Sequence, residues 1–311
     1  MRVAAVDCGT NSLRLLVADL DAESGEAVEV ERRTTIVRLG QDVDRTGVLA
    51  AAALRRTFAA LDGYAAIIAS LEVAATRVVA TSAARDAANR EVFLTGARTR
   101  LGVPPDIVSG DEEARLSYDG ATRGLRPGDD LATPLLVLDI GGGSTEFVMR
   151  PEAVGDVMGR SLGIGSVRLT ERHLRDDPPT QQQRDAAVTD IDAALDTLEL
   201  PLAEVNTLVG VAGTTLTMAA MVLDLPAYDR NAVHLARIDT AGLLRAVDAI
   251  VAMSVAERRD LAFMHPDRAD VIGAGALVLG CVVRRLGLDT LVPSSHDILD
   301  AIAWSLAGPR T

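Results

Sequence analysis

The sequence predicts an α/β fold made by an internal duplication, with a cleft between its two halves. The first observation is a pattern that occurs twice: an apolar strand runs into an aspartate, a turn rich in Gly, Ser and Thr follows, and a second strand begins. The two copies are VAAVDCGTNSLRLLV at residues 3–17 and LLVLDIGGGSTEFV at residues 135–148. The second observation is that strand and helix patterns follow each copy, which is typical of a layered α/β architecture.

The hydrophobic pattern predicts the elements in order, with strands assigned where apolar residues alternate and helices where they recur at helical spacing. The first half gives a strand hairpin at 3–20 and strands at about 26–38, 76–80 and 107–108. Its helices are expected at 48–70, at 83–100 and after the last of these strands. The second half gives strands at 135–139, 145–150 and 207–211, a further segment at 161–169, helices at 181–199, and a mostly helical remainder that ends with 297–306. Residues 124–130 are polar and rich in breakers, so they are the candidate boundary. We place the first domain at 1–127, completed by a C-terminal helix at 297–311, and the second at 128–296.

Each turn has the composition of a phosphate-binding loop. Glycine lets the backbone approach an anion, and free N–H groups and Ser or Thr hydroxyls supply hydrogen-bond donors. The candidates are Gly9, Thr10, Asn11 and Ser12 in the first turn and Gly142, Gly143, Ser144 and Thr145 in the second. Because a strand follows each turn, the pattern differs from a dinucleotide-binding fold, whose Gly-rich turn opens a helix. Two such turns facing each other would clamp a phosphoryl group.

Composition excludes several classes of function. All 31 basic residues are arginine, so the lysine of P-loop ATPases and of Schiff-base enzymes is missing. The net charge of -13 argues against a general nucleic-acid binder, and no apolar run has the length of about 18 residues that a membrane span needs. Cys8 and Cys281 form no close pair, which fits a reduced compartment without structural zinc. With no leader pattern at the N-terminus, we expect a cytoplasmic protein.

Two carboxylates, Asp139 and Glu146, flank the second turn. If the turn closes a hairpin, both return to the same end of the cleft, where they can hold Mg²⁺ directly or through water. The alternatives are an Asx-type turn residue for Asp139 and a surface strand position for Glu146.

Two adjacent glutamates begin a predicted helix. Ser109 and Glu112 have the spacing of a capping box, so we interpret Glu112 as part of the helix start. Glu113 is not needed for that role, and its simplest interpretation is a solvated acid in the first turn. Ser82 has the character of an N-cap, which would put Arg85 in a first turn, where a cation opposes the helix dipole unless an anion is near.

The two turns, together with TLVGVAGTT at residues 207–215, resemble the phosphate and adenosine motifs of the actin, Hsp70 and sugar-kinase superfamily. Within it, the chain resembles the exopolyphosphatase/guanosine pentaphosphate phosphohydrolase family over nearly its full length. The stretches that match in family order are VRLG (37–40), ATSAARDAAN (80–89), SGDEEARL (109–116), DIGGGSTE (139–146), VRLTER (167–172) and HPDRAD (265–270). The resemblance implies a duplicated actin-like, ribonuclease H-like two-domain fold with an interdomain cleft.

The resemblance also implies roles for matched residues. Glu113 matches the catalytic glutamate that activates or orients the attacking water. Arg85, Arg14 and Arg268 match arginines that contact phosphates, and a solvated charge is the alternative for the last two. The remaining matches are Gly213 and Thr214, for phosphate binding, and Asp7, for the metal or its water network. The chain departs from the family at Asp300-Ala301-Ile302, where many members carry Arg-Glu-Gly, a change that could affect substrate contacts or domain closure.

The implied activity is a hydrolase, dependent on Mg²⁺ or Mn²⁺, that removes the terminal phosphate of inorganic polyphosphate. The nearest alternative is a guanosine pentaphosphate 5′-phosphohydrolase that uses the same site. A kinase of the superfamily and a non-catalytic polyphosphate or nucleotide sensor are further alternatives. The expected partners are polyphosphate or guanosine pentaphosphate, with neither nucleic acid nor membrane, and the resemblance is compatible with a homodimer.

Overall fold

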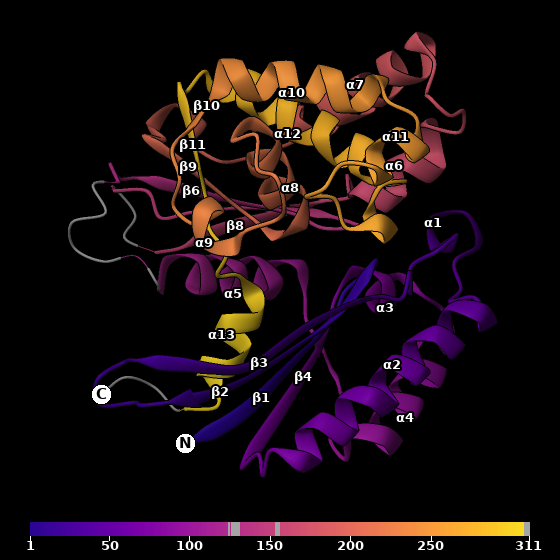
Figure 1. Cartoon of the computed structure of the whole chain (residues 1–311), viewed down its shortest axis with the longest axis vertical. Helices are drawn as coiled ribbons and strands as arrows, with labels where there is room; N and C mark the ends of the chain where they lie inside the picture. The colour runs from indigo at the N-terminus through magenta and orange to yellow at the C-terminus, as the bar shows by residue number, and fades with distance from the viewer. Residues whose placement is uncertain (124, 126–130, 153–155, 308–311) are drawn as a thin grey trace. The chain divides into compact units, whose positions relative to one another are not determined.

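A computed structural model describes residues 1–123, 125, 131–152 and 156–307. The chain divides into two compact units, one made of Met1–Arg123 and Ile298–Thr311 and the other of Gly124–Asp297 (Figure 1). Most of the predicted boundary stretch, residues 124 and 126–130, lies outside the described residues.

The first unit contains one five-stranded mixed sheet. Its strands, in the order β3-β2-β1-β4-β5, are β3 (Ala27–Ile36), β2 (Ser12–Leu20), β1 (Arg2–Cys8), β4 (Ala75–Ala80) and β5 (Asp106–Ile107). β1, β2 and β3 form an antiparallel meander, and β4 and β5 run parallel to β1. Its helices are α1 (Val43–Thr46), α2 (Ala51–Ser70), α3 (Ser82–Asp86), α4 (Arg90–Leu101), α5 (Gly110–Arg123) and α13 (Ile298–Ser305).

Alternate residues of β1 point to opposite faces of this sheet. Ala4 and Val6 belong to the apolar cluster that includes α2 and α4, whereas Val3 and Ala5 pack with α13. Figure 1 shows α2 and α4 on one side of these strands and α13 on the other. Asp7 therefore lies on the α13 face, and α13 in turn packs against α5.

The second unit contains a six-stranded mixed sheet. Its strands, in the order β10-β11-β9-β6-β7-β8, are β10 (Ile238–Asp239), β11 (Thr290–Pro293), β9 (Thr207–Val211), β6 (Leu135–Ile140), β7 (Thr145–Met149) and β8 (Met158–Leu162). Its α-helices are α6 (Ser166–His173), α7 (Gln181–Asp196), α8 (Ala212–Val222), α9 (Arg230–Val233), α10 (Thr240–Ala252), α11 (Val255–Arg259) and α12 (Ile272–Leu286). Two short 3₁₀ turns, Leu202–Glu204 and Pro266–Arg268, complete the described elements. Leu136, Leu138 and Ile140 pack with α6, α7, α8, α10 and α12, so Asp139 points to the other face of the sheet.

The two sheets repeat the same topology. β8-β7-β6-β9-β11 matches β3-β2-β1-β4-β5, with an antiparallel meander followed by two parallel strands in each case. The predicted α/β class and internal duplication are therefore confirmed.

One prediction of local structure was wrong, and the structure gives more detail for two further segments. The helix predicted at 83–100 is two helices, α3 and α4, because the Asn89 side chain leaves the helical pattern and forms two hydrogen bonds with the backbone of Leu49. The segment at 161–169 is the end of β8 and the start of α6, separated by a turn that contains Gly163 and Gly165. The remainder predicted as mostly helical also contains the short strands β10 and β11.

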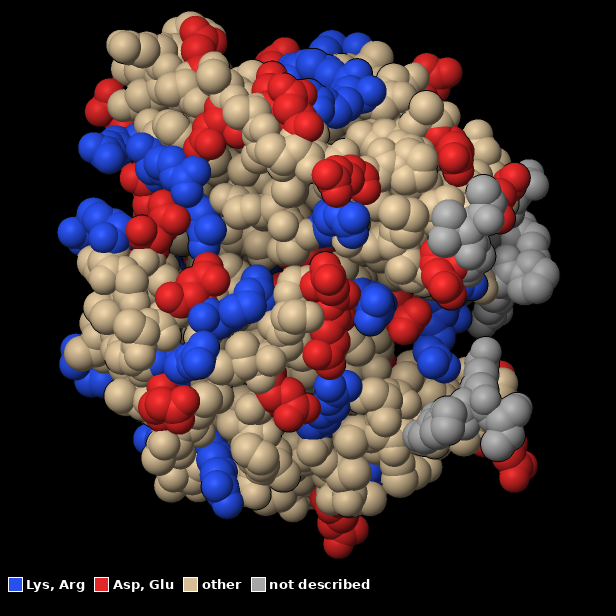
Figure 2. Space-filling view, turned by 180° about the vertical axis from the view of Figure 1, so that it is seen from behind, with Lys and Arg blue, Asp and Glu red and all other residues tan. Residues whose placement is uncertain are grey.

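Among the described residues, no helix combines the length and apolar character needed to cross a membrane. On the face drawn in Figure 2, acidic and arginine side chains lie among one another. Such mixing is typical of an ordinary solvated surface.

Candidate active site

The two Gly-rich turns have the same backbone geometry. The N–H of Gly9 donates to the carbonyl of Ser12 at 3.0 Å, and the N–H of Gly141 donates to the carbonyl of Ser144 at 3.0 Å. A Cβ at Gly9 or Gly141 would lie 3.1 or 3.0 Å from that carbonyl oxygen, so both positions favour glycine. Gly141 is thus the counterpart of Gly9. The sequence analysis had not singled out Gly141 as a site residue.

A neighbouring loop holds the carbonyl groups of each turn. In the first unit, the carbonyls of Thr10 and Asn11 accept from Gly40 N–H and Val37 N–H at 2.8 and 3.0 Å. A trans peptide directs its C=O and N–H to opposite sides. The N–H of Asn11, which shares a peptide with the Thr10 carbonyl, therefore points away from this loop.

The second turn is held in the same way by the start of α6. The carbonyls of Gly141 and Gly142 accept from Ser166 N–H and Val167 N–H, each at 2.9 Å. The N–H groups of Gly142 and Gly143 consequently point away from α6, as donors for an anion require. A Cβ on Gly165 would overlap the backbone of Gly142 and Gly143, so this close approach requires glycine there.

The polar side chains of the turns fall into two groups. Thr10 and Ser144 are buried, and the amide oxygen of Asn11 is buried without a hydrogen-bond partner in the described structure. Thr145 is fully buried, and its hydroxyl donates to the carbonyl of Ile164 at 2.6 Å. This arrangement argues against the predicted phosphate contact by Thr145 and favours a role in fixing the turn.

In the first hairpin, Asp7 lies directly opposite Arg14 in the β1–β2 ladder. The Nε and Nη2 atoms of Arg14 donate to the same Asp7 carboxylate oxygen at 2.9 and 2.6 Å. Both side chains are largely buried. The structure thus brings together a residue predicted to bind phosphate and a residue predicted to contribute to the metal site, and each serves as the other's ion-pair partner.

In the second hairpin, the residue opposite Asp139 is Glu146, and the residue opposite Glu146 in the next strand is Ser161. Cross-strand partners point to the same face, so the three side chains form a row across β6, β7 and β8. Asp139 is 7% exposed and Glu146 is 1% exposed. The predicted return of both carboxylates to one end of the hairpin is therefore observed.

Two buried carboxylates at directly opposed positions repel each other, and a bound cation offsets that repulsion. Carboxylate oxygens are ligands that Mg²⁺ favours, and Mg²⁺ commonly uses one or two of them with waters and substrate phosphates. Within the described residues, no group of three or more His, Cys, Asp or Glu side chains is arranged to hold a metal ion. The residues present fit a site of the two-carboxylate kind.

The adjacent glutamates of α5 have different environments. The Glu112 N–H donates to Ser109 Oγ at 3.1 Å, which confirms Ser109 as the capping residue. The side chain of Glu112 is 49% exposed and lies 3.4 Å from Arg77. The side chain of Glu113 is only 10% exposed, and its Oε2 accepts from Arg85 Nη1 at 2.9 Å. The solvated-acid alternative for Glu113 is therefore wrong.

The predicted place of Arg85 in its helix was wrong. Ser82 is the first residue of α3, Thr81 precedes it without a side-chain cap, and Arg85 lies in the last turn of this five-residue helix. The dipole argument therefore does not apply. Arg85 is held instead by two acceptors, Glu113 Oε2 and the carbonyl of Val108, the latter at 3.0 Å from Nη1.

Two of the predicted residues, Gly213 at the start of α8 and Arg268, lie next to each other. Gly213 leaves space for the guanidinium of Arg268, which would overlap a Cβ at this position. Nη1 of Arg268 donates to Thr217 Oγ1 at 3.1 Å. Thr214 is buried against Gly275.

Cys8, beside the first turn, is not suited to nucleophilic chemistry. Its thiol is buried, and desolvation, followed by the charge of Asp7, raises its pKa well above the usual value. The neutral thiol is the unreactive form.

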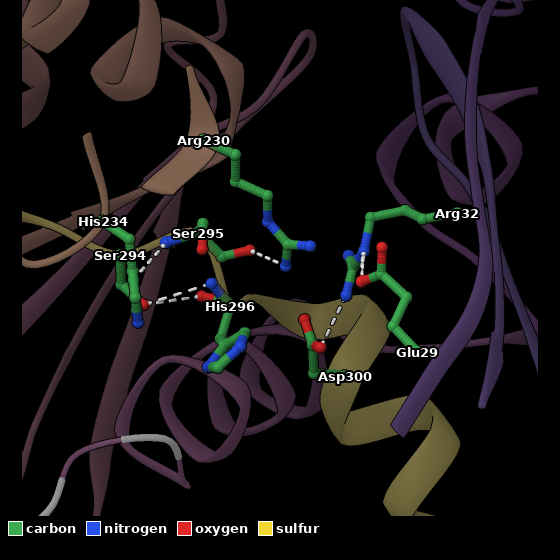
Figure 3. A network of polar contacts seen from close by, with 8 residues as sticks. All are labelled: Glu29, Arg32, Arg230, His234, Ser294, Ser295, His296 and Asp300. Carbon is green, nitrogen blue, oxygen red and sulfur yellow. Dashed lines mark hydrogen bonds and ion pairs between the residues drawn. The ribbon is translucent and has the colours of Figure 1, made fainter. Parts of the chain in front are cut away.

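Asp300, where the chain departs from the family, and the nearby Ser295 both have internal partners (Figure 3). In the second unit, Ser295 N–H donates to His234 Nδ1 at 3.1 Å, and Arg230 Nη2 donates to the Ser295 carbonyl at 3.1 Å. In the first unit, Asp300 accepts from Arg32 Nη2 at 2.7 Å, which ties α13 to β3. Asp300 therefore has a structural role within its own unit.

The repeated sheets and their matched turns have the predicted duplicated actin-like two-domain fold. The chain belongs to the Ppx/GppA phosphatase family, which matches residues 16–296. It is 46% identical to exopolyphosphatase 2 of Mycobacterium tuberculosis, over 99% of both chains. It is also similar to a crystal structure described as an exopolyphosphatase-like protein, with 41% identity, a TM-score of 0.93 and 98% of both chains covered. A guanosine-5′-triphosphate,3′-diphosphate pyrophosphatase of Photobacterium profundum is 28% identical, over 97% of this chain and 59% of the relative.

Sequence reasoning missed Gly40, Gly141, Gly165 and Ser161. Gly141 could have been found by aligning the two turns. Gly40 and Gly165 support the turns from distant segments, and the place of Ser161 depends on strand register.

Proposed function

We propose that this chain is an exopolyphosphatase that hydrolyses the terminal phosphoanhydride bond of inorganic polyphosphate. The observation that carries the proposal is the ion pair between buried Glu113 and half-buried Arg85, in a chain 46% identical to an exopolyphosphatase. A carboxylate that is kept next to a guanidinium is stabilised in its ionised form, which is the form that accepts a proton.

In the proposed reaction, Glu113 orients a water molecule and accepts its proton as the water oxygen attacks the terminal phosphorus. The P–O bond to the penultimate phosphate breaks, so that orthophosphate and a chain shorter by one phosphate leave. Arg85 positions the Glu113 carboxylate. The N–H groups of Gly142 and Gly143 offer donors for the phosphoryl oxygens.

Asp139 and Glu146 are the proposed ligands of Mg²⁺, directly or through water. When bound, Mg²⁺ would neutralise negative charge on the phosphate oxygens. The opposed positions and the burial of the two carboxylates support this assignment. Because the Asp7 carboxylate is bound to Arg14, we assign Asp7 to the ion pair in preference to the metal.

The second candidate is hydrolysis of the 5′-terminal phosphate of guanosine pentaphosphate. The similarity to the Photobacterium pyrophosphatase favours it. Both substrates end in a phosphoanhydride, so the same residues would serve both reactions.

Phosphate release with Mg²⁺ from short polyphosphate, long polyphosphate, guanosine pentaphosphate and ATP tests the proposal and ranks the candidates. Glu113→Gln should keep substrate binding and lose kcat by about 10²–10⁴-fold, the usual contribution of a general base. Glu112→Gln is the matched control, because its side chain is exposed and in the same helical turn, and it should retain turnover.

Near-normal turnover of Glu113→Gln, or an equal loss in Glu112→Gln, would remove Glu113 from the mechanism. A wild-type protein that binds polyphosphate and releases no phosphate from any of these substrates would instead favour the sensor.

A further inference from the structure

Ser161 lies on β8, in the same cross-strand row as the two carboxylates of the second hairpin. Its hydroxyl donates to Glu146 Oε1 at 2.7 Å. Neither strand register nor this hydrogen bond follows from a sequence motif. We infer that Ser161 is a positioning residue, which holds the Glu146 carboxylate beside Asp139 in the orientation that a divalent cation requires.

The physical need for such a residue comes from the charges in the row. Glu146 has three side-chain torsions, and Asp139 directly opposite repels its carboxylate. A short hydrogen bond from a neutral hydroxyl disperses part of the negative charge and restricts those torsions without adding a competing ion. Ser161 donates to one carboxylate oxygen of Glu146, and a carboxylate has about four acceptor positions on its two oxygens, so one hydroxyl donor does not exclude a cation.

The first unit provides a matched position. In its row, Asp7 faces Arg14 and Arg14 faces Thr34, so Thr34 corresponds to Ser161. There the arginine holds the acid directly, and Thr34 is exposed on β3. Both units therefore carry a hydroxyl at this place in the row. In the first unit the residue opposite it is Arg14, whereas in the second unit it is Glu146, which accepts a hydrogen bond from Ser161.

This inference rests on the proposed metal site, and its test does not need turnover. Binding of Mn²⁺ to the full chain, without substrate, is followed by the electron paramagnetic resonance signal of free Mn²⁺. Ser161→Ala should weaken Mn²⁺ binding by about 10- to 100-fold, the usual effect of removing a residue that orients a metal ligand. Ser161→Thr keeps the hydroxyl on a strand-compatible side chain and should stay within about threefold of wild type. Thr34→Ala should bind Mn²⁺ as wild type does.

Thermal unfolding without metal should leave Ser161→Ala close to wild type, which separates metal binding from folding. In phosphate release, Ser161→Ala should need more Mg²⁺ for half-maximal rate and recover near-normal kcat at saturating Mg²⁺. Unchanged Mn²⁺ affinity in Ser161→Ala, or an equal loss in Ser161→Thr, would overturn the inference. Absence of Mn²⁺ binding by wild type would overturn it as well, whereas wild-type phosphate release reports separately on the proposed hydrolase activity.

Discussion

In the first hairpin Asp7 faces Arg14, and in the second hairpin Asp139 faces Glu146 at the matched place in the ladder. The surrounding backbone is otherwise repeated, because Gly9 and Gly141 make the same hydrogen bond across their turns. The first hairpin balances its acid internally with an arginine. The second places two acids side by side, where we propose that a divalent cation binds.

This difference shows how a duplicated unit acquires two roles from one backbone. The Asp7–Arg14 pair uses both members of the row for internal stability. The Asp139–Glu146 pair is the proposed metal site, and Ser161 donates a hydrogen bond to Glu146. The matched position is occupied by arginine in one copy and by glutamate in the other, and we propose that this difference separates the two roles.

The largest expected effect comes from making the second hairpin resemble the first. Glu146→Arg would remove a proposed metal ligand and place a cation opposite Asp139. Phosphate release should fall by at least about 10³-fold, equivalent to roughly 4 kcal/mol of activation free energy, at every Mg²⁺ concentration. The loss is measured as the rate of phosphate release from polyphosphate over a series of Mg²⁺ concentrations.

Circular dichroism should show that Glu146→Arg remains folded, since the matched Asp7–Arg14 pair is accommodated on the same backbone. Glu146→Gln, which is nearly isosteric, provides the second variant if the arginine does not fit. If either variant showed the same Mg²⁺ dependence as wild type, Glu146 would not be a metal ligand, and the proposed difference between the two hairpins would be wrong.

The next effect concerns stability in the first hairpin. Arg14→Met leaves the buried Asp7 carboxylate without its guanidinium and should cost about 3 kcal/mol of unfolding free energy. The double variant Asp7→Asn with Arg14→Met should recover part of this loss, because partners in contact are not additive. Urea unfolding of the single and double variants gives the coupling free energy between Asp7 and Arg14. If the losses of the two single variants simply add up in the double variant, the pair does not stabilise the hairpin.

The smallest effect compares the glycines that support each turn. A Cβ at Gly165 would meet the backbone of the second turn, whereas a Cβ at Gly40 would meet the side chains of Thr10 and Ala83. Backbone yields less readily than a side chain, so Gly165→Ala should destabilise more than Gly40→Ala, with a cost of about 1–3 kcal/mol for the former. Thermal unfolding tests the order of the two variants. Equal Tm values for the two variants would contradict this order, because they would show that the backbone of the second turn yields as readily as the side chains around Gly40.

Much of this architecture could be predicted from the sequence because it depends on local patterns. The two turns carry their own glycines and flanking strands, and the Ser109 cap identified Glu113 as the glutamate not used in helix initiation. The duplication followed from the similarity of two short segments, and both sheets confirm it.

The remaining features depend on tertiary contacts that no local pattern specifies. The ion pair of Arg14 depends on strand register, which places it opposite Asp7. The break between α3 and α4 depends on two hydrogen bonds between the Asn89 side chain and the backbone of Leu49, forty residues earlier in the chain. The donors for the turn carbonyls likewise come from loops distant in sequence, so the orientation of the turn N–H groups required the structure.

The most direct test measures phosphate release from polyphosphate against Mg²⁺ concentration for wild type, Asp139→Asn and Asp7→Asn under the same conditions. We expect Asp139→Asn to need about 10-fold or more Mg²⁺ for half-maximal rate, because one of two proposed ligands loses its charge. Asp7→Asn should keep the wild-type Mg²⁺ requirement, since the Asp7 carboxylate is paired with Arg14. An unchanged requirement in Asp139→Asn, or a shift of the same size in Asp7→Asn, would contradict the assignment of the metal to the second hairpin.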